Sequence, residues 1–154
     1  MGSLILVRHS ITAASAAGRN LGRSDDAPLA PEGVALAAHL AQTLASELAE
    51  LPHDELRILS SPALRCRQTA EPVAAELGLA ADAIEADHGL MEIDYGSWDG
   101  LTAEECLARD PELRTTWEAD PYATSCPNGE SGADVALRAF ATLEPLEAWL
   151  TARA

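Results

Sequence analysis

The chain has 154 residues, enough for one domain whose core needs no disulfide or metal to hold it together. Its formal charge of −15 argues against nucleic acid and anionic membranes as partners. No apolar run approaches the ~20 residues of a membrane span. The three cysteines lack CxxC spacing and the N-terminus lacks the pattern of a signal peptide, so we expect no metal site and a cytoplasmic protein.

The first predicted element is a short strand, Leu4 to Val7, buried on both faces, that ends in Arg8 and His9. In α/β sheets, ligands bind at the carboxyl ends of strands. A fixed guanidinium beside a titratable nitrogen nucleophile indicates phosphate chemistry there, although an Arg-His pair that simply ends a strand in solvent is about equally plausible from this stretch alone. Six of the ten arginines lie in residues 1–69, whose net charge is only −1.

Residues 10–30 form a polar connection that contains Asn20 and Arg23. A loop of this length in a domain is usually functional or disordered, so we weigh an anion-binding loop against a flexible surface loop. Pro31 and Glu32 then favour the start of a helix that ends at Pro52.

Residues 56–59 predict a second strand, which runs into Ser60, Ser61 and Pro62. These residues favour the start of a helix that ends at Gly78. Arg65 falls in the first turn of this helix, where free N–H groups and the helix dipole already favour an anion. Two strand-to-helix junctions of one sheet thus carry arginine.

The remainder of the chain contains a weak third strand at 83–86 and a turn-rich stretch at 93–100. Helices are predicted after a capping box at 102–105, over 111–117, and from Ser131 onwards with a kink at Pro145. Only three strands alternate with these helices, whereas sheets usually have about four to six. We therefore expect a mostly parallel sheet from which a strand is missing.

Five segments in this order resemble motifs of the histidine phosphatase superfamily, which contains the cofactor-dependent phosphoglycerate mutases and related phosphatases. They are residues 6–12 (the Arg-His signature, with Ser10 in place of glycine), 20–33, 60–70, 90–100 and 127–131. The resemblance covers the whole chain. It implies an α/β three-layer sandwich with a mostly parallel sheet flanked by helices, made by a single domain, 1–154, that is incomplete at its C-terminus.

The resemblance also implies a mechanism. His9 would attack phosphorus and form a phosphohistidine, and Glu92 would protonate the leaving oxygen. Arg8 and Arg65 would hold the phosphoryl oxygens, with Asn20, Arg23 and Ser10 as further phosphate-binding residues. No metal or cofactor is needed. The expected partner is a small phosphorylated substrate or inorganic phosphate.

The family has a second histidine after a C-terminal strand, and no histidine of this chain matches it. Three functions therefore remain open: a phosphatase acting on small phosphomonoesters, a mutase-type phosphotransferase, and a non-catalytic phosphate-binding or interaction domain. An unpaired first strand would also leave an edge open to association. We expect either a homodimer that covers this edge or a longer chain that supplies the strand.

Overall fold

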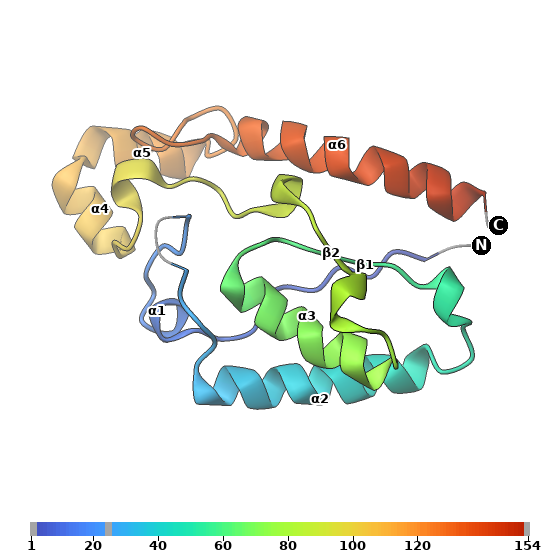
Figure 1. Ribbon diagram of the computed structural model, residues 1–154. Helices are drawn as coiled ribbons and strands as arrows, with labels where there is room; N and C mark the ends of the chain where they lie inside the picture. The colour runs from blue at the N-terminus through green and yellow to red at the C-terminus, as the bar shows by residue number, and fades with distance from the viewer. Residues whose placement is uncertain (1–2, 24–25, 153–154) are drawn as a thin grey trace. The chain divides into compact units, whose positions relative to one another are not determined.

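Two short parallel strands, with helices beside them, organise the first of two units in the computed structural model, which describes residues 3–23 and 26–152 (Figure 1). The strand unit comprises Arg8–Ala16 and Asp26–His88. The helical unit comprises Met1–Val7, Ala17–Asp25 and Gly89–Ala154. The predicted α/β class with a parallel sheet flanked by helices is confirmed.

In the strand unit, β1 (Ile58–Ser60) pairs with β2 (Ile84–Ala86) in parallel register, Ile58 opposite Ile84. Helix α3 (Leu64–Glu76) contacts both strands and packs on α2 (Pro31–Glu47). The apolar core lies between these two helices and is formed by Ala41, Leu44, Val73 and Leu77. The smaller elements of this unit are α1 (Ala13–Ala16), η1 (His53–Glu55) and η2 (Ala81–Ala83), and η3 (His88–Leu90) lies where the chain passes from the strand unit to the helical unit.

Local sequence rules explain these helices. Pro31 is the first residue of α2, as predicted. Proline is favourable there because an N–H at the first position of a helix has no partner within the helix, so its absence costs nothing. Helix α3 ends before Gly78, whose φ of +70° lies in the left-handed region that glycine adopts without strain. Its start differs from the prediction, since the N-cap residue is Ala63, which has no side chain able to cap the helix, and not a serine.

The helical unit contains η4 (Gly96–Trp98), α4 (Ala103–Arg109), α5 (Pro111–Ala119) and α6 (Gly132–Thr151). The predicted capping box at the start of α4 is confirmed, and a second one, between Ser131 and Asp134, starts α6. Pro145 lies inside α6. The core of this unit is built on the fully buried Trp98, whose ring meets Trp117 edge-on at 6.1 Å. None of the helices in the described residues is both long and apolar enough to cross a bilayer.

The predicted first strand is wrong. Residues 4–7 belong to no strand, and their side chains are 47% to 81% exposed. A strand buried on both faces needs ladder partners and cover on each side. The ladder of the described residues joins β1 to β2 alone, so two of the three predicted strands are present. The homodimer that would cover these aliphatic residues stays a prediction.

Candidate functional site

His9 is held in one tautomer by its own neighbour. The ring is half-buried, and Nδ1 lies 2.8 Å from the carbonyl oxygen of Ser10. A carbonyl oxygen can only accept a hydrogen bond, so Nδ1 must carry the proton. In the neutral imidazole, Nε2 then keeps the lone pair. The ring is therefore arranged to act as a nucleophile through Nε2.

A chain of hydrogen bonds ties this segment to the first turns of α3. The Ser10 N–H donates to Thr69 Oγ1 at 3.0 Å, and that hydroxyl donates to the Arg65 carbonyl at 2.8 Å. The Ser10 hydroxyl donates to the Gly33 carbonyl at 2.7 Å. Thr69 is only 3% exposed. The structure thus brings His9, Ser10 and the backbone of Arg65 into one network, in which Thr69 is the link.

Arg8 and Arg65, two of the four arginines of the strand unit, differ in environment. Arg8 is exposed, and within the described residues it forms no ion pair. Arg65 is the second residue of α3 and is 2% exposed. The N-terminus of α3 already holds one anion, because Asp26 Oδ1 accepts the Leu64 N–H at 2.6 Å.

Asn20 and Arg23 lie in the helical unit, where their donors already have partners. Nδ2 of Asn20 donates to the Trp98 carbonyl at 3.2 Å and to Cys106 Sγ at 3.4 Å. The Arg23 guanidinium donates to both carboxylate oxygens of Glu130 at 2.9 Å and to the Glu92 carbonyl at 3.0 Å. Phosphate binding by these two residues stays a prediction, and it would require them to exchange these partners.

Glu92 is exposed and its backbone is held by arginines. Arg138 Nη2 donates to the Glu92 carbonyl at 3.0 Å, as Arg23 does from its own Nε. The carboxylate of Glu92 accepts the N–H of Ile93 at 2.9 Å. The predicted site residues Arg23 and Glu92 are therefore neighbours in the structure of the helical unit.

Glu130 is the charged centre of this arrangement. Burial alone would raise its pKa, but hydrogen bonds from Arg138 and the Asp94 N–H, with the charges of Arg138 and Arg23, hold the pKa below its usual range. A carboxylate with two arginine partners is a strong acceptor. Glu130 is therefore ionised wherever the protein is folded near neutral pH.

Three residues of these networks were missed by the sequence analysis as site residues: Thr69, Glu130 and Arg138. Thr69 lies one helical turn after Arg65, a spacing that places both on one face of α3. Glu130 belongs to the 127–131 segment, which was identified as a family motif but given no role. Arg138 had no local signal, since its partners are the Glu130 carboxylate, outside its own helix, and backbone carbonyls remote in sequence.

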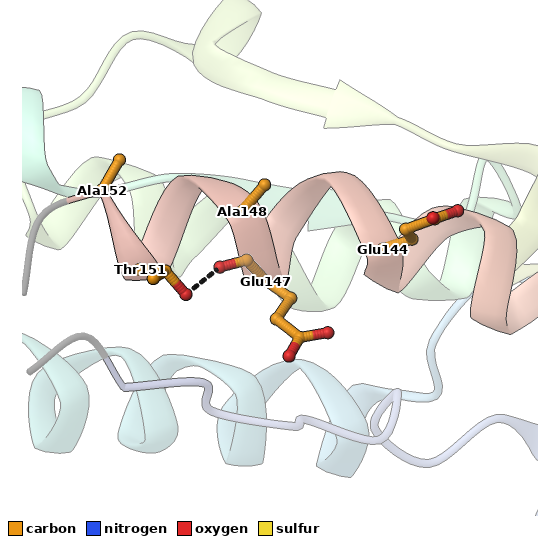
Figure 2. Close-up of a pocket in the computed structure, with 5 residues that line it drawn as sticks. All are labelled: Glu144, Glu147, Ala148, Thr151 and Ala152. Carbon is orange, nitrogen blue, oxygen red and sulfur yellow. Dashed lines mark hydrogen bonds between the residues drawn. The ribbon is translucent and has the colours of Figure 1, made fainter.

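Two further features of the molecule bear on ligand binding. Within the part of the chain that the structure describes, no group of three or more histidine, cysteine or acidic residues is placed to hold a metal ion. A depression with a volume of about 490 Å³ lies on the last turns of α6. Figure 2 shows the residues that line it: Glu144, Glu147, Ala148, Thr151 and Ala152. The Thr151 hydroxyl donates to the carbonyl of Glu147 there. Its two carboxylates would repel phosphate.

Comparison with known proteins identifies the family to which the chain is similar. The family model of the histidine phosphatase superfamily (branch 1) matches residues 4–151. Phosphoserine phosphatase 1 of Hydrogenobacter thermophilus is 35% identical over 94% of this chain and 64% of its own. The glucosyl-3-phosphoglycerate phosphatase of Mycobacterium tuberculosis is 33% identical over 97% of this chain and 60% of its own.

A solved structure of mycobacterial glucosyl-3-phosphoglycerate phosphatase in complex with VO3 matches with a TM-score of 0.74 at 32% identity. The match covers 94% of this chain and 65% of that one. The same enzyme has also been solved with inorganic phosphate. The chain thus spans 60% to 65% of the length of these relatives. The chain belongs to branch 1 of the histidine phosphatase superfamily.

Proposed function

We propose that the protein hydrolyses the phosphomonoester of a small phosphorylated metabolite through a phosphohistidine intermediate. The observation that carries the proposal is the hydrogen bond between His9 Nδ1 and the Ser10 carbonyl, because it leaves the lone pair on Nε2. Membership of the family and the phosphatase relatives support the same reaction class. The names of these relatives specify phosphoserine and glucosyl-3-phosphoglycerate, both small phosphorylated compounds.

In the first step, His9 Nε2 attacks phosphorus and forms the P–N bond while the bond to the leaving oxygen breaks. The leaving oxygen takes the proton of the Glu92 carboxyl group. In the second step, Glu92 as carboxylate takes a proton from water, whose oxygen attacks phosphorus. The P–N bond breaks, inorganic phosphate leaves, and both residues return to their starting states.

We assign phosphate binding to two arginines of the strand unit, Arg8 and Arg65. Arg8 is exposed and Arg65 lies at the start of α3, and guanidinium groups match the oxygens of a phosphoryl group with two parallel hydrogen bonds. Charge on these oxygens is spread in the loose transition state, so fixed cations stabilise it. Ser10 would add its hydroxyl by giving up the bond to Gly33.

The net charge of −15 is the reason for proposing a small substrate and not a nucleic acid. Mutase activity would follow if a second substrate hydroxyl, in place of water, took the phosphoryl group from His9. We place the reaction in the cytoplasm, where phosphorylated metabolites are made and used.

Hydrolysis of p-nitrophenyl phosphate by the wild-type chain and by His9→Ala tests this proposal. His39→Ala is the matched control, because His39 is an exposed histidine on α2 that no part of the mechanism uses. We expect turnover to be lost in His9→Ala and kept in His39→Ala, with both variants folded by circular dichroism. Activity retained by His9→Ala contradicts the proposal. Vanadate binding by a wild-type chain with no turnover would favour the non-catalytic domain.

A further inference from the structure

The backbone around Glu92 is held by side chains and not by regular structure. Residues 91–95 belong to no helix or strand. Their carbonyl groups therefore need partners from elsewhere. Arg138 on α6 supplies two of these partners, donating to the carbonyls of Met91 at 2.6 Å and Glu92 at 3.0 Å, and it also donates to the carbonyl of Gly89, just before this stretch, at 2.8 Å. One guanidinium thus fixes the path of four consecutive residues.

Arg138 is itself fixed by Glu130. The Glu130 carboxylate accepts Nε of Arg138 at 3.2 Å and Nη2 at 3.0 Å, a two-pronged pair with both side chains 20% exposed. Glu130 also accepts the Asp94 N–H at 3.1 Å, and its own N–H donates to the Asp94 carbonyl at 2.8 Å. The same carboxylate therefore orients the arginine and holds the residues that follow Glu92.

The position of the Glu92 carboxyl depends on this backbone. The side chain is exposed, and the contact that orients its Oε1 is the N–H of the next residue, Ile93. A general acid must lie within hydrogen-bond reach of the atom it protonates. A displacement of about 1 Å can cost on the order of a hundredfold in rate.

We propose that Glu130 and Arg138 are positioning residues that hold Glu92 in place to protonate the leaving oxygen. This inference rests on the proposed function in one respect, the role of Glu92 as the acid. It assigns a task to the conspicuous segment 127–131 and to a helix residue that the mechanism otherwise leaves unused.

The test compares two substrates that differ in their need for an acid. p-Nitrophenyl phosphate has a good leaving group, which departs without a proton, whereas phenyl phosphate has a poorer one. The quantity measured is the ratio of kcat/KM for the two substrates. We expect Glu92→Gln to lower the rate on phenyl phosphate by about a hundredfold more than on p-nitrophenyl phosphate. Arg138→Met and Glu130→Gln should shift the ratio in the same direction, by about tenfold.

Arg114→Met is the matched control. Arg114 is a buried arginine of the helical unit that pairs with Glu118 and lies over the rings of Trp98 and Trp117, and within the described residues it makes no hydrogen bond or ion pair with the residues around Glu92 that Arg138 holds. Its loss should lower stability and leave the substrate ratio unchanged. The double variant Glu92→Gln/Arg138→Met should show the ratio of Glu92→Gln alone, because the arginine acts through the acid.

The outcomes separate the two proposals. An unchanged ratio in Glu92→Gln removes the acid role and with it that part of the proposed function. A shifted ratio in Glu92→Gln with an unchanged ratio in Arg138→Met and Glu130→Gln overturns the positioning role alone. Hydrogen exchange of the 89–95 amides gives a readout without turnover. Faster exchange in Arg138→Met than in Arg114→Met supports positioning, and equal exchange overturns it.

Discussion

Gly33→Ala is expected to destabilise the protein although alanine is the better helix former. Gly33 is the third residue of α2, and a Cβ there would lie 2.1 Å from the carbonyl oxygen of Ile11. Real Cβ atoms essentially never come closer than 3.0 Å, so the Ile11 segment must move by about 1 Å. That carbonyl accepts the Ala30 N–H at 2.9 Å, and the Gly33 carbonyl accepts the Ser10 hydroxyl at 2.7 Å.

Overpacking costs about 1–3 kcal/mol, and each of the two strained hydrogen bonds contributes about 1 kcal/mol. The better helix propensity of alanine returns at most about 1 kcal/mol. The free energy of unfolding should therefore fall by about 2–4 kcal/mol, which lowers Tm by about 4–16 °C. Because Ser10 follows His9, vanadate affinity should fall as well.

Urea denaturation followed by far-UV circular dichroism measures this change. Ala38→Gly, at an exposed position of the same helix, is the control for propensity alone and should cost about 1 kcal/mol. A Gly33→Ala variant as stable as the wild type, or more stable, would refute the reasoning from the close approach to Ile11.

Three further predictions concern Thr69, Glu130 and Cys126. Thr69→Val leaves the Ser10 N–H without its acceptor, so the free energy of unfolding should fall by about 1–3 kcal/mol relative to Thr69→Ser in urea denaturation. The pKa of Glu130 is lower in the folded state than its ordinary 4.5, because arginine and backbone hydrogen bonds outweigh the effect of burial. Such a group stabilises the fold above its unfolded pKa and loses this contribution as pH falls through the folded value. The stability difference between wild type and Glu130→Gln should thus be constant at and above about pH 6 and shrink on acidification below pH 4.5; a difference that grows in acid contradicts this. Desolvation raises the pKa of the Cys126 thiol to about 11, so iodoacetamide at about pH 8 should modify Cys66 first, as mass spectrometry of the folded protein would show; equal modification would count against it.

The helices were predictable because local chemistry determines them. Pro31 at the first position of α2 and the box formed by Thr102 and Glu105 act within one turn of the chain. The prediction of a strand at residues 4–7 was wrong for the opposite reason. An aliphatic run indicates burial, but burial requires a partner remote in sequence, and within the described residues no strand pairs with it.

The candidate site shows the same division. The motifs around His9 and Arg65 identify the segments that carry chemistry. Helical spacing places Thr69 on the same face of α3 as Arg65, but the hydrogen bond that Thr69 accepts from Ser10 depends on the fold. Contacts of Arg138 with backbone carbonyls are equally invisible, because carbonyl groups are common to all residues. The side chains that carry the chemistry can be predicted from the sequence. The hydrogen-bond partners that orient these side chains become known only from the folded chain.

The proposed mechanism requires that His9 becomes phosphorylated during turnover. Rapid acid-free quenching of the full chain with p-nitrophenyl phosphate, followed by proteolysis and mass spectrometry, tests it directly. We expect one phosphoryl group on His9, stable in base and lost in acid, and none in His9→Ala. Turnover without any phosphorylated histidine, or with the phosphoryl group on another residue, would contradict it.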